Sequence, residues 1–228
     1  MDIIPPHHRR NIAITLGFIG GAIDVYCHTQ FKTLVATQTG NVVMMASDIL
    51  DKKYSFFIAK LVAIILFAIG FVAGIYIKQH ARTALWRIYA LIPMTVATVI
   101  LPFIHSHTVL SIMVLSFGTG IVMNSYAGTK IETVPYTIMM TSGNFRRMLS
   151  SIYTFVTTPA KKRSAQVHRD VSNYVIIVLS FLAGAFVSAV AVHVCGAYAV
   201  WLVTRVLLVV SYLYATSVLR ENLKDKVF

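Results

Sequence analysis

Six long apolar runs dominate the pattern of hydrophobic and polar positions along the chain. They cover residues 11–27, 56–78, 84–104, 108–128, 172–194 and 198–218, and charged or polar residues bound each run. A helix needs about 20 apolar residues to cross the roughly 30 Å hydrocarbon core of a bilayer. The pattern therefore predicts an all-α, polytopic membrane helix bundle with about six transmembrane helices, forming a single membrane domain over residues 1–228.

Two further segments have the length of a membrane span but carry polar residues and glycine near their middles. They cover residues 31–50 and 132–152, and the second also contains a proline. Non-helical backbone at membrane depth is tolerated only where it is buried in protein or lines an aqueous cavity. These two segments are therefore predicted to be re-entrant or broken helices that do not face lipid.

Composition and charge agree with a membrane protein whose two ends lie in the cytoplasm. The chain is 57% hydrophobic and 12% charged, with a formal net charge of +12, whereas soluble domains average about 25% charged residues. Lys and Arg concentrate in cytoplasmic loops. Six spans with a cytoplasmic N-terminus leave only Lys32, Lys52 and Lys53 outside, whereas full crossing by both broken segments would strand Arg146 and Arg147 in the bilayer. This pattern explains the basic excess better than a nucleic-acid surface does.

The two broken segments are related by an internal repeat. A shift of 103 positions places Gly40 and Asn41 over Gly143 and Asn144. Each copy belongs to a unit of span, broken segment, span and span, over residues 11–104 and 108–218. An odd number of crossings turns the second unit upside down, which predicts a 3+3 inverted repeat. Paired interruptions in inverted repeats indicate the binding site of a secondary transporter, near the midplane.

The candidate site therefore gathers polar residues from both broken segments. Glycine permits strained backbone and close approach of a ligand, and asparagine is a common N-cap of the helix that follows it. An ionisable residue inside a span suggests function, so Asp24 is a candidate proton carrier, and Arg205 either pairs with it or extends to the outer headgroups. Lys60 is expected to extend to the headgroups in the same way. The predicted substrate-binding residues are Asp24, Thr37, Thr39, Gly40, Asn41, Asn124, Thr141, Ser142, Gly143 and Asn144, with Asp24 and Arg205 in ion coupling.

The same residues carry a family resemblance over nearly the whole chain. A glycine-rich first span that ends in Asp24, the tripeptide Thr39-Gly40-Asn41, a later span that ends in Asn124, and Ser142-Gly143-Asn144 together resemble the YoaK-like family of bacterial inner-membrane proteins. The resemblance implies an integral membrane fold in the bacterial cytoplasmic membrane. It adds little about chemistry, because the function of that family is not established.

The leading hypothesis is a secondary transporter of a small polar or anionic solute. The alternatives are a non-transporting membrane scaffold or regulator and, third, a membrane enzyme or channel. No P-loop, nucleophile elbow, HExxH or dinucleotide motif occurs, so neither an enzyme nor a cofactor or metal site is expected. The expected partners are the lipid bilayer and a small solute or ion, without nucleic acid, and homo-oligomers are left open.

Overall fold

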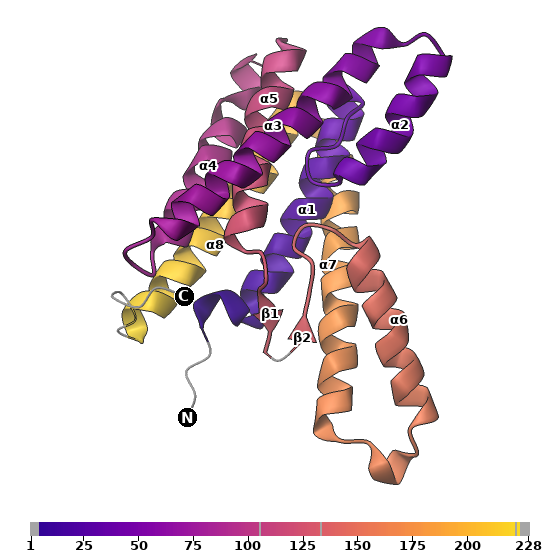
Figure 1. Cartoon of the computed structure of the whole chain (residues 1–228), viewed down its shortest axis with the longest axis vertical. Coiled ribbons are helices and arrows are strands. Elements are labelled where there is room, and N and C mark those ends of the chain that lie inside the picture. The colour runs from indigo at the N-terminus through magenta and orange to yellow at the C-terminus, as the bar shows by residue number, and fades with distance from the viewer. Residues whose placement is uncertain (1–4, 105, 133, 222, 224–228) are drawn as a thin grey trace.

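The computed structural model describes residues 5–104, 106–132, 134–221 and 223. Over these residues the chain is all-α apart from one short hairpin of strands β1 (Lys130–Ile131) and β2 (Val134–Pro135), which pair antiparallel (Figure 1). The helices are α1 (Arg10–Phe31), α2 (Gln38–Leu50), α3 (Tyr54–Gln79), α4 (Trp86–Ile104), α5 (Thr108–Ser125), α6 (Ser142–Thr157), α7 (Ala165–Cys195) and α8 (Trp201–Arg220).

Helix length and hydropathy make the chain a multi-pass membrane protein. Five stretches are long and apolar enough to cross a membrane: α1, α3, α4, α5 and residues 165–220. The last stretch comprises two helices, because α7 ends at Gly196, where φ is +56°, and a short 3-10 turn leads into α8. Large apolar side chains on α3, α7 and α8 are exposed on the outside of the bundle, as contact with lipid requires.

Helix α7 begins seven residues before the apolar run that predicted it. The apolar run begins at residue 172, whereas α7 begins at Ala165. The additional turns are polar, and the Ser164 side chain accepts a hydrogen bond from the Val167 amide at 3.4 Å. Because serine at this position supplies an acceptor for the free amides of the first turn, the helix begins outside the apolar run and extends beyond the span.

The two ends of the bundle are distinct, and we call them the near end and the far end. At the near end Arg9 pairs with Glu221, and the Glu132 amide donates to the His8 carbonyl, so the beginning of α1 and the end of α8 lie there (Figure 1). Burial, with the nearby Arg87 charge, lowers the pKa of His7 to about 2, so this imidazole is neutral at physiological pH. The far end holds the last turn of α1 and the beginning of α3.

Helix α1 crosses α7 at glycines that allow the two backbones to touch. A Cβ atom on Gly21 would collide with the carbonyl oxygen of Phe181, and a Cβ on Gly184 would collide with the carbonyl of Phe18. Small residues permit this close approach between membrane helices. Gly17 packs at the same crossing, since a Cβ on it would overlap the Ser180 hydroxyl.

Helix α3 crosses α5 in the same reciprocal manner. A Cβ on Gly70 would collide with the carbonyl oxygen of Phe117, and a Cβ on Gly120 would collide with that of Phe67. Gly74, one turn further along α3, lies against Ile121 and Asn124. The closest helix pairs of the bundle are thus α1 with α7 and α3 with α5, and α4 joins them through contacts with α5 and α8.

Replacing Gly184 by Val is expected to lower the free energy of unfolding by more than about 2 kcal/mol, since overpacking a tight contact typically costs about 1–3 kcal/mol and here the obstacle is backbone. Thermal unfolding of the detergent-solubilised protein measures the effect. The control is Ala183→Val, an exposed position on the same helix. Equal unfolding temperatures for the two variants would contradict this helix crossing.

The excess of cations at the near end predicts that this end lies in the cytoplasm. Lys52, His80 and His107 are all exposed in loops, His80 at the near end and the other two at the far end. With Cys27 and Cys195 replaced and a single cysteine at each position, a membrane-impermeant thiol reagent applied to intact cells should label positions 52 and 107. Labelling at position 80 alone would mean the opposite orientation.

Candidate functional site

The first break in the helical path lies between α1 and α2, and Asp24 of α1 holds it in place. One carboxylate oxygen accepts hydrogen bonds from the amides of Val35 at 2.9 Å and Ala36 at 2.8 Å. The other accepts from the Thr37 amide at 3.1 Å and the Thr37 hydroxyl at 2.5 Å. Asp24 is only 5% exposed. The carboxylate therefore satisfies the backbone donors that precede α2, where a negative charge is also favoured by the helix dipole.

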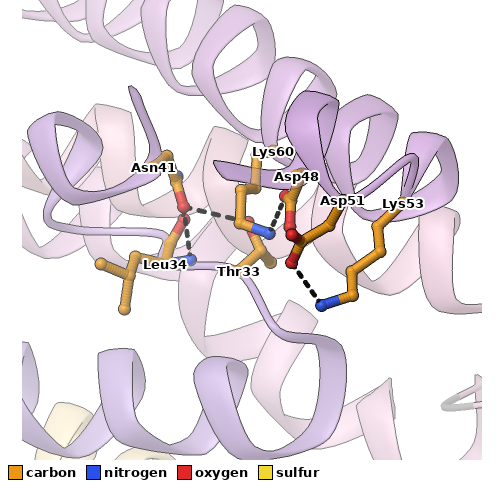
Figure 2. A network of polar contacts seen from close by, with 7 residues as sticks. All are labelled: Thr33, Leu34, Asn41, Asp48, Asp51, Lys53 and Lys60. Atoms are coloured by element: carbon orange, nitrogen blue, oxygen red, sulfur yellow. Dashed lines mark hydrogen bonds and ion pairs between the residues drawn. The ribbon is translucent and has the colours of Figure 1, made fainter. Parts of the chain in front are cut away.

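Asn41 closes the same loop from the other side. Its side-chain oxygen accepts from the Leu34 amide at 2.8 Å and from the Thr33 hydroxyl at 3.2 Å, and its amide group donates to the Leu34 carbonyl at 2.7 Å (Figure 2). The same amide group donates to Gln38 at 2.8 Å. Asn41 is fully buried, so the side chain satisfies both backbone groups of one loop residue.

The second break, between β2 and α6, contains the same contact. The oxygen of Asn144 accepts from the Thr137 amide at 2.8 Å, and its amide group donates to the carbonyls of Thr137 at 2.7 Å and Met140 at 2.8 Å. Asn144 is also fully buried. We call this pairing of an asparagine with both backbone groups of the residue seven positions earlier the asparagine clasp.

The clasp corrects the predicted role of both asparagines. They were expected to be N-caps, but the N-cap residues are Thr37 for α2 and Thr141 for α6. Each asparagine lies in the first turn of its helix and bonds backwards to the loop. The buried loop backbone needs hydrogen-bond partners, and each asparagine supplies them from the first turn of its helix.

Both loops contact one face of α1. A Cβ atom on Gly20 would collide with the backbone of Met139 in the second loop, and Asp24, four residues further on, binds the first loop. Residues four apart lie on the same helix face, one turn from each other. The structure thus brings the two breaks together at the middle of α1. Gly20 and Met139 join the candidate site, although no sequence pattern distinguishes them from the other glycines and methionines.

The remaining predicted residues fall into three groups. Thr37 and Thr141 are half-buried, whereas Thr39 and Ser142 are exposed. Gly40 and Gly143 were expected in strained backbone, but both lie in regular helix, and the positive-φ glycines of the described residues are Gly128 and Gly196. A Cβ on Gly40 would meet the Leu34 side chain at 2.6 Å, and one on Gly143 would meet that of Thr137 at 3.1 Å, so these glycines make room for the loop.

Asn124 of α5 is buried beside Gly74 of α3. Its side-chain oxygen is inaccessible and finds no hydrogen-bond partner among the described residues. Next to it, a cleft of about 290 Å³ is lined by Phe71 and Met123 and by residues 136–138 of the second loop. Thr137, whose backbone is held by the asparagine clasp, therefore borders open space.

Arg205 does not pair with Asp24. It is exposed on α8, and the ion pairs found in the described ranges join Arg9 to Glu221, Lys53 to Asp51 and Lys60 to Asp48. Of the two interpretations of Arg205, the structure agrees with a side chain that faces the outside. Asp24 has no need of a cationic partner, because four hydrogen-bond donors already surround it.

Lys60 was expected to extend to the headgroups, and this expectation was wrong. Its side chain is 2% exposed, and its ammonium lies 2.6 Å from the carboxylate of Asp48 on α2 (Figure 2). Nearby, Lys53 donates to Asp51 at 2.7 Å, and this hydrogen bond raises the pKa of the exposed Lys53 ammonium. A cation buried this deeply is retained only with a partner, and Asp48 lies twelve residues before it across the α2–α3 turn.

Fold and site together define a multi-pass helical membrane protein with two interrupted segments that meet on a central helix. The chain belongs to the family described as "Protein of unknown function (DUF1275)", whose model matches residues 12–213. No curated protein and no solved structure matches the chain. The family assignment covers both breaks and the helices around them.

Replacing Asp24 by Asn is expected to destabilise the protein by about 2 kcal/mol. The second oxygen becomes an amide donor that faces the Thr37 amide and hydroxyl, and a buried donor left without an acceptor costs about 1–3 kcal/mol. Thermal unfolding in detergent measures the loss. Asp51→Asn is the control, because an exposed ion pair contributes at most about 1 kcal/mol. Similar losses in the two variants would show that the Asp24 contacts do not hold the loop.

Proposed function

We propose that this protein is a secondary transporter of a small polar or anionic solute, built as an inverted repeat whose two broken segments form the solute path. The observation that carries the proposal is the asparagine clasp, which occurs twice. Residues 34 and 41 and residues 137 and 144 are paired by the same bonds, 103 positions apart. The glycine before each asparagine also meets the same loop residue, Leu34 or Thr137.

The glycine crossings support the repeat independently of the loops. Each crossing helix carries a Phe-x-x-Gly tetrapeptide, and each glycine meets the carbonyl of the phenylalanine on the partner helix. In the proposed repeat α1 of the first half corresponds to α5 of the second, and α3 corresponds to α7. The α1–α7 crossing therefore corresponds to the α5–α3 crossing, which has the same reciprocal contacts. The four tetrapeptides begin at Phe18, Phe67, Phe117 and Phe181.

The directions of the short helices support the inversion. From the middle of the bundle α2 leads toward the far end and α6 toward the near end (Figure 1). The two helices have 13 and 16 residues, or about 20 and 24 Å at 1.5 Å per residue, which is too short to cross the hydrocarbon core. With α7 and α8 counted separately, each half has three spans and one re-entrant segment, and the near end faces the cytoplasm of a bacterial cell.

Transport accounts for the position of these breaks better than a static bundle does. Irregular backbone at membrane depth is expensive and occurs where it lines a cavity, and the second loop lines the 290 Å³ cleft beside Asn124. Paired interruptions that converge between inverted repeats are typical of the binding sites of secondary transporters. We place the solute at the two loops, in reach of Thr37, Thr141 and Asn124.

Asp24 is our candidate for coupling to protons, without Arg205. Protonation would remove acceptor capacity from the carboxylate and weaken four hydrogen bonds to residues 35–37 at once. The first loop would then be freer to leave α1. In this proposal the proton acts by releasing a loop, and the proton site and the gate are the same group.

A scaffold or regulatory protein is the main rival, and it predicts that changes at the loops alter only stability. A membrane enzyme ranks third, and we assign no catalytic residue. Uptake measured on purified protein in liposomes separates these classes.

Wild-type proteoliposomes are expected to accumulate at least one of labelled acetate, phosphate or glycine under an imposed proton gradient. Asn144→Leu and Gly20→Ala disturb the second loop from its two sides, and each should reduce uptake at least tenfold. Ser142→Ala, which changes an exposed side chain of the same segment, should leave uptake unchanged. Size-exclusion chromatography identifies the variants that fold.

Two results would count against transport. One is the absence of uptake of every solute by wild-type protein that is folded and correctly inserted. The other is full uptake by folded Asn144→Leu and Gly20→Ala proteins, because the loops would then have no part in the solute path.

A further inference from the structure

A second cleft lies at the far end, between α2, α3 and the last turn of α1, and it reaches the first loop at Lys32. It holds about 410 Å³, within the roughly 300–1,000 Å³ typical of small-molecule sites. Its lining combines charge of both signs with an aromatic ring. The charged and aromatic side chains that line it include Lys32, Asp48, Asp51, Lys53, Phe56 and Lys60.

The Lys60–Asp48 pair at this cleft is part of an unusual attachment of α2, which is held by buried polar side chains. Asn41 and Asp48 are the buried residues of α2, and both are polar. They lie seven positions apart, so the clasp is at one end of the helix and the ion pair at the other (Figure 2). Several apolar side chains of α2 are exposed instead. Taking two charges out of water costs several kcal/mol per ion before their attraction offsets it.

The other half of the chain shows that this packing does not require an ion pair. A smaller cleft of about 150 Å³ lies between α6 and α7, lined by Ser151, Thr154 and Asp170. Ser151 is 103 positions after Asp48 and so occupies the corresponding place in the repeat. No ion pair joins α6 to α7 within the residues that the structure describes. The buried charges of the α2–α3 cleft are therefore a property of one half only, which points to binding instead of helix packing.

The charges of the α2–α3 cleft are not balanced. Lys60 is paired with Asp48 and Lys53 with Asp51, whereas the exposed Lys32 forms no ion pair in the described part of the chain. Lys60 has donor capacity left, because an ammonium group has three N–H donors and, among the described residues, Asp48 is its carboxylate partner. The cleft therefore has one uncompensated positive charge and two ammonium groups that can donate.

We propose that the α2–α3 cleft binds a small organic monoanion, with its carboxylate held by Lys32 and Lys60 and its apolar body against Val43, Met44 and Phe56. The single negative charge matches the net charge of the lining. The apolar side chains of the lining supply a surface for a short aliphatic or aromatic group. Binding of the anion does not require transport. The inference rests on the proposed function only where it takes the bound anion to be the transported solute.

Three compounds that share a branched four-carbon isobutyl unit test the charge class by calorimetry on the purified full-length protein in detergent. They are isovalerate, an anion; valine, a zwitterion; and isobutylamine, a cation. Isovalerate should bind saturably and more tightly than either of the others. Lys32→Gln should weaken isovalerate binding about tenfold, as expected for a lost charge-assisted hydrogen bond.

The ion pair is tested with the charge-neutral double variant Asp48→Asn with Lys60→Met, since a change at Lys60 alone would leave Asp48 buried without its partner. This variant should keep the wild-type unfolding temperature within a few degrees and lose at least about tenfold in isovalerate affinity. Ser151→Ala, in the corresponding cleft of the other half, should bind isovalerate as the wild type does.

Saturable isovalerate binding that is lost in the double variant supports the site even if proteoliposomes show no uptake, and the protein would then be an anion-binding membrane protein without transport. Uptake without isovalerate binding would overturn the inference and leave the transport proposal standing. Tighter binding of valine or isobutylamine would overturn the charge class, and unchanged affinity in the folded double variant would overturn the location.

Discussion

The need to satisfy backbone polar groups away from water governs the middle of this bundle. Wherever a helix is interrupted at that depth, each free amide and carbonyl requires a partner from the protein itself. The Asp24 carboxylate and the two clasping asparagines supply many of these partners, and Gln38 and Tyr174 each donate to one further carbonyl. These bonds attach the first loop to α1 and each loop to the helix that follows it, whereas the second loop meets α1 by packing Met139 against Gly20.

The two breaks meet this requirement differently, and the difference is informative. The first loop has a clasp and a carboxylate, so its donors are bound on two sides. The second has a clasp and a close contact with Gly20, and it borders open space. A similar contrast separates the two outer clefts, of which one contains a buried ion pair and the other hydroxyl groups. A duplicated scaffold thus carries chemistry that is not duplicated.

The sequence predicted the helices well, because apolar runs of membrane length leave few alternatives. It also identified Asp24, Asn41 and Asn144, since polar residues inside membrane segments are conspicuous. It could not identify their partners, which are backbone groups whose positions depend on the loop conformation. Lys60 was misread for a similar reason: its partner Asp48 lies on another helix, and only the α2–α3 turn brings the two together. Gly20 differs from neighbouring glycines only in what packs against it.

The reciprocal glycine crossings have a consequence for how the protein is assembled. Helices α1 and α3 belong to the first half of the chain, yet their close partners, α7 and α5, belong to the second. During synthesis α1 and α3 therefore enter the bilayer before the helices that pack against their glycines. The two halves are interlocked and cannot mature one after the other, so a nascent chain that stops before α7 lacks the helix against which α1 is shaped to pack.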